Sequence, residues 1–228
     1  MKLIRVLFVI CALGVSSFSF AQLVEIGAKG GLNLSNLNLS PDGKLVGTNY
    51  HGAIGYHLGG YALIKLKKIS LQPELLYSTQ GQYFTTVSYS NLKTTLNYIN
   101  IPIMIKYYLT GSLHIQAGPQ FSILASSKGD LNQIQGGNFA GPPVFNQNLS
   151  SYLKRTDFAL AFGAGINLPV NLNLSIRYNI GITDINKNTG SQVPFPGDLQ
   201  PSFSTAYTRN QVLQISIGYK LREFKKKK

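Results

Sequence analysis

The sequence predicts an all-β fold, an eight-stranded antiparallel up-and-down transmembrane β-barrel. Three observations predict it: apolar and polar residues alternate in eight stretches, the connections between these stretches are in turn long and short, and only 13% of the residues are charged. Alternation indicates strands with one apolar face, and a soluble domain carries about 25% charged residues. The shortage of charge indicates that much of the surface does not face water.

The first 21 residues form a segment of their own. Lys2 and Arg5 precede an apolar run at residues 7–15, and residues 19–21 place small side chains around a cleavage site. This pattern is typical of a secretory signal peptide, so we expect cleavage before Gln22. The apolar run is too short to cross a bilayer as a helix.

The mature chain is then a barrel over residues 22–224 with a basic tail at 225–228. Loss of the leader removes Lys2 and Arg5, so the net charge falls from +13 to +11. The only cysteine, Cys11, is lost as well. Neither disulfides nor thiol chemistry therefore support this fold.

Each of the eight alternating stretches is long enough to cross a bilayer as a tilted strand, which takes about nine to eleven residues. No run of 18 apolar residues follows Ala21, so any span must be made of strands. The predicted strands are 23–34, 50–64, 69–83, 95–109, 112–124, 156–168, 172–183 and 211–221.

The connections between these strands fall into two classes. The short ones are 65–68, 110–111 and 169–171, and the long ones are 35–49, 84–94, 125–155 and 184–210. Outer-membrane barrels have short periplasmic turns and longer extracellular loops. We therefore expect both mature termini to be periplasmic, at the end of the short turns.

Prolines stand in or at the end of four predicted strands, at Pro73, Pro102, Pro119 and Pro169. Proline has no N–H to donate to a neighbouring strand. These positions predict bulges or locally broken pairing.

Alternation alone does not distinguish a membrane barrel from a soluble one. The residue types on the polar face indicate whether that face contacts water or the barrel interior. In 69–83 and 172–183 that face is made mostly of small or amide side chains, with about one charge in each strand. A face in contact with water would be dominated by Lys and Glu. The apolar face therefore points to lipid, with predicted lipid-facing residues Ile99, Ile101, Ile103, Ile105, Leu174, Ile176, Ile215 and Ile217.

The few charges on the polar face predict a network inside the barrel. By the alternation, Glu25, Lys29, Glu74, Lys106 and Arg177 all point inward. A buried charge is costly unless it is paired. We expect Glu74 to bridge Arg177 and Lys106, with Glu25 and Lys29 nearby.

Short motifs along the chain resemble those of the PorT-like outer-membrane β-barrel family of Bacteroidetes. They are GAKGGLN at 27–33, QPELLYS at 72–78, YINIP at 98–102 followed by KY at 106–107, AGP at 117–119 and RYN at 177–179. The resemblance implies an OmpA-like eight-stranded barrel in a Gram-negative outer membrane. One member of that family is associated with protease export by the type IX pathway, whereas most have no assigned role.

The C-terminus departs from what the resemblance implies. Such barrels often end in an aromatic residue that the barrel-insertion machinery recognises, whereas here Phe224 is followed by the lysines 225–228. We expect Tyr219, Leu221 and Phe224 to serve as the recognition strand.

The sequence predicts no catalytic, cofactor-binding or metal site. It contains only His51, His57 and His114, without a close acidic cluster or an HExxH motif. The glycines at 27–31 lack the GK[ST] ending of a phosphate loop. An enzyme would need His57 or His114 beside a serine such as Ser78 or Ser122, and no nucleophile motif surrounds either serine.

The leading hypothesis is a non-enzymatic outer-membrane barrel with a structural or interaction role, linked to protein secretion or envelope integrity, whose loops 125–155 and 184–210 contact a protein partner. The other expected partners are the insertion machinery and outer-membrane lipids. The basic residues expected at the lipid headgroups are Lys65, Lys67, Lys68, Arg222 and the lysines 225–228. Nucleic acid is not expected, because the leader takes the chain away from it. A narrow solute channel, a lipid-modifying enzyme and a soluble barrel with an apolar interior remain alternatives.

Overall fold

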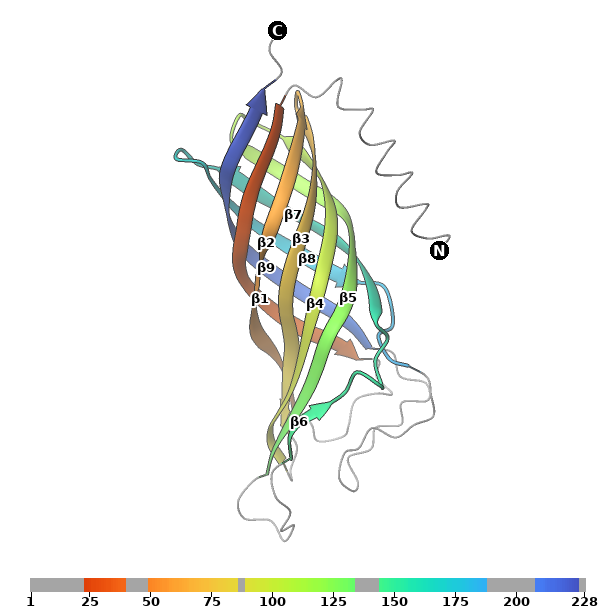
Figure 1. Cartoon of the computed structure of the whole chain (residues 1–228). Helices are drawn as coiled ribbons and strands as arrows, with labels where there is room; N and C mark the ends of the chain where they lie inside the picture. Colours follow the sequence, from red (N-terminus) through yellow and green to blue (C-terminus); the bar gives the residue numbers. More distant parts are fainter. Residues whose placement is uncertain (1–22, 40–48, 86–88, 134–143, 188–207, 226–228) are drawn as a thin grey trace, which may run out of the picture.

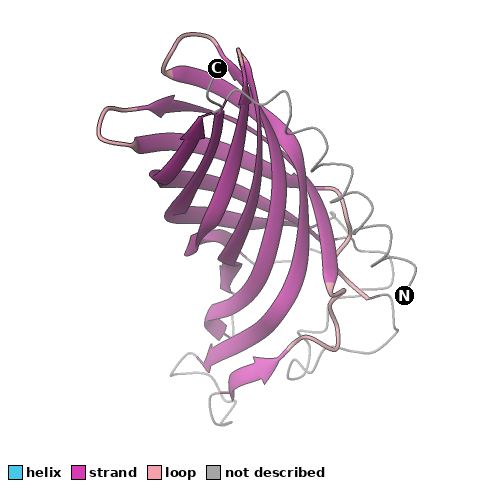
Figure 2. Cartoon of the chain, turned by 45° about the horizontal axis from the view of Figure 1, so that its top comes forward, coloured by secondary structure: helices cyan, strands magenta, loops and turns pink. Residues whose placement is uncertain are grey.

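The computed structural model describes residues 23–39, 49–85, 89–133, 144–187 and 208–225. In these ranges it has nine strands and, as Figure 2 shows by its colours, only strands and loops. No helix in them is long and apolar enough to cross a membrane. The strands are β1 (Leu23–Leu39), β2 (Asn49–Leu66), β3 (Ile69–Thr85), β4 (Tyr89–Tyr108), β5 (Leu113–Gln133), β6 (Val144–Asn148), β7 (Thr156–Asn167), β8 (Leu172–Gly181) and β9 (Thr208–Lys225).

Eight of the strands close into a ring (Figure 1). Their order is β4-β3-β2-β1-β9-β8-β7-β5, and an additional pairing of β4 with β5 completes the circle. Every pairing is antiparallel, as an up-and-down barrel requires. The fold class predicted from the alternation is confirmed.

The turns at one end of the barrel are short. Lys67 and Lys68 alone separate β2 from β3, residues 109–112 join β4 to β5, and residues 168–171 join β7 to β8. Leu23 pairs with Lys225 at this same end, at the top of Figure 1. We call it the short-turn end and the opposite one the loop end.

Several strands continue beyond their predicted limits at the loop end. β4 begins at Tyr89 instead of residue 95, β5 runs on to Gln133 instead of 124, and β6 lies inside the predicted loop 125–155. The predicted loop 84–94 shrinks to residues 86–88 because the pairing of β3 with β4 continues to Phe84 and Leu92. The backbone pairing thus extends beyond the residues whose alternating pattern predicted the strands. As a result, β3, β4 and β5 form a tall wall that reaches farther toward the loop end (Figure 1).

A row of side-chain hydrogen bonds marks where the apolar outer face of this wall ends. The Thr79 hydroxyl donates to Asn97 Oδ1 at 2.9 Å, and Asn97 Nδ2 donates to Ser126 Oγ at 2.9 Å, which links β3, β4 and β5. A bulge between Asn97 and Tyr98 lies at the same level. On the short-turn side of this row the outward residues are apolar, starting with Tyr77, Ile99 and Ile123.

The prolines interrupt pairing without shifting its register. Pairs are present at Pro73↔Ile103 and again at Leu76↔Asn100, with the same register on both sides of the gap. Pro102, paired with Gln120, begins a similar gap between β4 and β5. The broken pairing expected at prolines therefore occurs in the strands, whereas the bulges lie elsewhere, such as at Ile26/Gly27.

Candidate functional site

The outer face of the barrel is apolar. All eight residues predicted to face lipid point outward, with exposed fractions between 37% for Ile101 and 56% for Ile217. Their neighbours Asn100, Met104, Lys106 and Arg177 are at most 3% exposed. The alternative of a soluble barrel with an apolar interior does not fit this arrangement.

A buried ion cluster crosses the middle of the interior. Arg177 Nη2 and Nη1 lie 2.7 and 3.1 Å from the two carboxylate oxygens of Glu74. Lys29 Nζ donates to the same oxygens at 3.2 and 3.3 Å, and Gln72 Nε2 donates at 2.7 Å. Arg177 also donates to Gln116 Oε1 at 3.3 Å. The cluster connects β1, β3, β5 and β8, which lie around the barrel wall.

The predicted bridge from Glu74 to Lys106 is wrong, because Lys29 takes that place. The residue opposite Lys29 on β2 is Gly59, which has no side chain, so the lysine reaches across β2 to Glu74 on β3. Lys106 pairs with Ser70, four residues before Glu74, or about 13 Å along the strand. Lys106 is nevertheless buried, with 3% of its surface exposed.

Glu25 lies apart from the central cluster, near the short-turn end. It is half-buried, and its Oε1 accepts a hydrogen bond of 2.7 Å from the Tyr61 hydroxyl. The Tyr61 ring lies where a side chain at Gly27 would stand, so that glycine lets the ring cross β1. Lys65 Nζ lies 4.3 Å from the ring centre of the inward-facing Tyr108. Lys65 therefore lines the barrel mouth and does not face the headgroups as predicted.

A second interior network has the connectivity of a catalytic triad. His57 Nδ1 lies 2.8 Å from Asn33 Oδ1, and His57 Nε2 lies 2.9 Å from Ser216 Oγ. Because Asn33 Oδ1 only accepts, Nδ1 carries the proton and Nε2 accepts from the serine. The three side chains are 1%, 0% and 2% exposed, respectively. All three side chains lie inside the barrel.

The serines that the sequence paired with histidines have other partners. Ser78 Oγ accepts from Asn33 Nδ2 at 3.0 Å, and Ser122 Oγ accepts from Gln120 Nε2 at 3.3 Å. The His114 ring packs against Tyr108 with 5.3 Å between ring centres. Ser216 was missed because its partner His57 lies two strands away, and only barrel closure brings β9 beside β1.

A structural feature that the sequence did not predict lies at the loop end. Residues 149–155 and 182–187, which we call the loop-end cap, are joined by a Leu153↔Asn186 bridge and by hydrogen bonds from Lys154 N to Ile185 O and from Lys187 N to Tyr152 O. Ile185 is 1% exposed and packs inside the barrel. Its buried neighbours are Leu96, Tyr98 and Leu124, with Leu37 and Leu153 at the edge.

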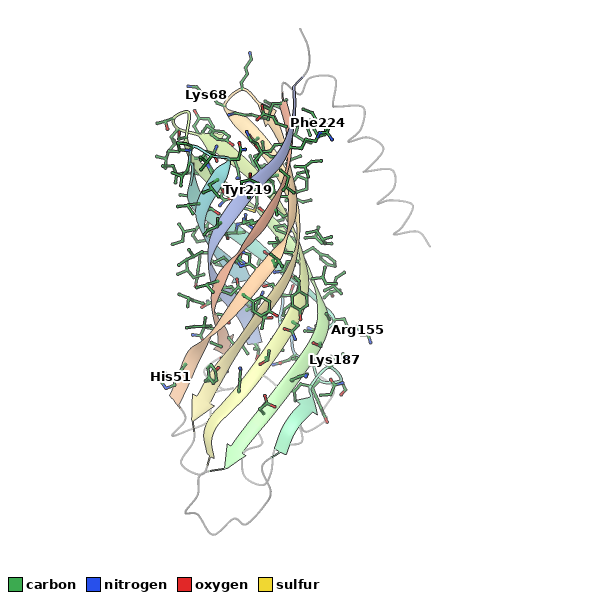
Figure 3. All side chains as sticks on the ribbon, turned by 60° about the vertical axis from the view of Figure 1, so that its left-hand side comes forward. His51, Lys68, Arg155, Lys187, Tyr219 and Phe224 are labelled. Carbon is green, nitrogen blue, oxygen red and sulfur yellow. The ribbon has the colours of Figure 1, made fainter. Side chains whose placement is uncertain are left out.

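Asp184 fixes the second segment of the cap. Its Oδ1 accepts from the backbone N–H groups of Asn186 at 3.1 Å and Thr208 at 2.9 Å, and Asn186 Nδ2 donates to Thr208 Oγ1 at 2.9 Å. Figure 3 shows Arg155 and Lys187 beside each other on this part of the molecule. The first residues of predicted loop 184–210 are therefore held against the barrel.

No group of three or more His, Cys, Asp or Glu side chains in the described ranges is placed to hold a metal ion. A closed ring of strands with an apolar outer face and a filled polar interior defines a transmembrane β-barrel. Residues 20–187 match the family described as "Outer membrane protein beta-barrel domain". The chain belongs to that family.

The chain is similar to several solved structures. Neisserial surface protein A is 12% identical with a TM-score of 0.45, over 86% of this chain and 97% of that one. The Yersinia pestis attachment invasion protein Ail is 11% identical with a TM-score of 0.46, over 88% and 98%. OprG of Pseudomonas aeruginosa is 12% identical with a TM-score of 0.47, over 90% and 97%. No curated protein sequence matches the chain.

Proposed function

We propose that the protein is a non-enzymatic, integral outer-membrane barrel with a structural or interaction role, and that its loop end presents the interacting surface. The observation that carries this proposal is the combination of an apolar exterior with an interior filled by buried polar side chains and crossed by a central ion cluster. Such an interior favours a structural or interaction role over conduction of solutes through the barrel. In this orientation the short-turn end and both mature termini are periplasmic.

The filled interior argues against the narrow channel that the sequence left open. Glu74, Arg177, Lys29 and Gln72 meet in the middle of the lumen and are all buried. An eight-stranded barrel has an interior that side chains fill. Protein reconstituted in a planar bilayer should show no conductance above that of empty membrane. Reproducible single-channel steps would replace this proposal with a pore.

The surface proposed for a protein partner consists of the loop-end cap with loops 125–155 and 184–210. The cap exposes Arg155 and Lys187 to solvent, and its backbone pairing holds their main chain in place, which lowers the entropy cost of binding. Most of loop 184–210 lies outside the described residues. The resemblance to PorT-like proteins supports a role in secretion or envelope integrity for this surface.

Lipid and the insertion machinery are the other proposed partners. The apolar outer face extends to the end of β9, where Tyr219, Leu221 and Phe224 are 48%, 64% and 45% exposed. Figure 3 shows Tyr219 and Phe224 along this last strand. We propose that these three side chains form the recognition strand. Phe224→Ala should reduce the amount of inserted barrel without changing the yield of unfolded chain.

The leader at 1–21 and the lysines at 226–228 lie outside the described residues and remain predictions. Fractionation of cells tests the location of the protein, and gel mobility before and after boiling tests whether it forms a closed barrel. Recovery in the outer membrane with a heat-dependent mobility shift would support the proposal. A soluble protein without such a shift would contradict it.

A further inference from the structure

The middle of the barrel interior holds more positive than negative charge. The buried cations are Lys29, Lys106 and Arg177, with exposed fractions of 4%, 3% and 1%. In the described part of the chain, Glu74 is the carboxylate within ion-pair distance of Lys29 and Arg177, and none lies within that distance of Lys106. Glu25, farther toward the short-turn end, is engaged by Tyr61. Lys106 is thus a buried cation without a counter-ion from the chain.

Buried polar groups without hydrogen-bond partners surround this lysine. Its direct neighbours across the sheet are Ser70 on β3 and Gln116 on β5, whose Cβ atoms lie about 5 Å away on the same inward face. Ser70 Oγ and Gln116 Nε2 are buried and have no hydrogen-bond partner in the described chain. The same is true of both ring nitrogens of His114, two residues before Gln116.

The position of Gln116 explains why its Nε2 group has no hydrogen-bond acceptor. Its Oε1 accepts from Arg177 at 3.3 Å, which is possible because Gly163 on the intervening strand has no side chain. Arg177 Nε is likewise unpartnered, whereas the acceptors left among these groups are Gln72 Oε1, the Ser70 hydroxyl oxygen and one ring nitrogen of His114. Donors therefore outnumber acceptors where positive charge is in excess.

We propose that the barrel interior binds one small inorganic anion of the halide class, held by Lys106 Nζ, Ser70 Oγ and Gln116 Nε2. An anion satisfies both deficits together, because it neutralises part of the excess charge and accepts several hydrogen bonds. Water alone meets the hydrogen bonds and leaves the charge of Lys106 unpaired. This site is independent of whichever partner the loop end binds.

The test compares refolded protein in bromide, chloride and gluconate at constant ionic strength, the last being too large for the interior. A ligand of the folded state raises the unfolding temperature with the logarithm of its concentration, here by roughly 3–5 °C for each tenfold change above the Kd. Crystals grown in bromide should show an anomalous peak beside Lys106. Equal stability in all three salts, with no such peak, would overturn the proposal.

Variants distinguish anion binding at this site from general effects of salt on the unfolding temperature. Gln116→Glu supplies a carboxylate where the anion is proposed, so its unfolding temperature should not respond to bromide. Lys106→Met should lose the response as well, and Lys93→Met, outside the interior network, should keep it. A bromide response that persists in both Gln116→Glu and Lys106→Met would place the anion elsewhere and overturn the site.

Discussion

Arg177 on β8 and Glu74 on β3 form a two-point ion pair through the middle of the barrel, although 103 residues separate them in the chain. Both side chains are buried, and Lys29 adds a second cation to the same carboxylate. The pair fixes opposite parts of the wall to each other. Its loss would therefore affect the closed barrel as a whole and not one hairpin.

Glu74→Gln should strongly destabilise the barrel. The amide keeps the shape of the side chain but leaves the Arg177 and Lys29 charges buried without a counter-ion, which costs about 3–5 kcal/mol. Urea-induced unfolding in detergent or vesicles measures the change. The double variant Glu74→Gln/Arg177→Gln should lose less than the sum of the single losses, and additive losses below about 1 kcal/mol would contradict the cluster.

Gly31→Ala should prevent or weaken barrel formation. A Cβ at Gly31 would collide with the backbone of Ile215 and Ser216 on the adjacent β9, and the displaced strands would separate His57 from Ser216. The measurement is the yield of heat-modifiable protein after refolding. Gly111→Ala is the matched control, because no atom lies within 4 Å of a Cβ built there. Equal yields from both variants would show that the wall tolerates the extra methyl group.

Val170→Asn should stabilise the protein. Val170 has a φ of 61° in the β7–β8 turn, a conformation that a β-branched residue adopts at a cost of about 1–3 kcal/mol and that asparagine tolerates well. The side chain is 77% exposed, so little packing is lost. A higher unfolding temperature is expected, and an unchanged or lower one would mean that the turn carries no such strain.

Ser216 should not behave as a catalytic nucleophile. Its burial at 2% exposure predicts no labelling of the folded protein by a fluorophosphonate probe. Ser216→Ala should instead cost about 1–3 kcal/mol of stability, because buried His57 Nε2 loses its donor. Stoichiometric labelling that disappears in Ser216→Ala would reopen the interpretation as a lipid-modifying enzyme.

The alternation predicted which side of each strand faces inward, because a two-residue period fixes direction wherever one face is apolar. It predicted Arg177 as one partner of Glu74, which the structure shows, but gave Lys106 and not Lys29 as the second, since that choice depends on Gly59 opening a path across β2 for Lys29. The tall wall of β3–β5 and the loop-end cap were also missed. Their residues pair through the backbone or by single contacts such as that of Ile185, and neither leaves a periodic pattern in the sequence.

Ile103 points outward and its neighbour Met104 points into the interior, and their exposed fractions are 44% and 0%. The chain from residue 22 onward contains no cysteine, so Ile103→Cys and Met104→Cys each give one labelling site for a small fluorophore attached before refolding. In vesicles of brominated lipid, we predict strong quenching at position 103 and little at position 104. Quenching at position 104 and not at 103 would show that the barrel is inverted.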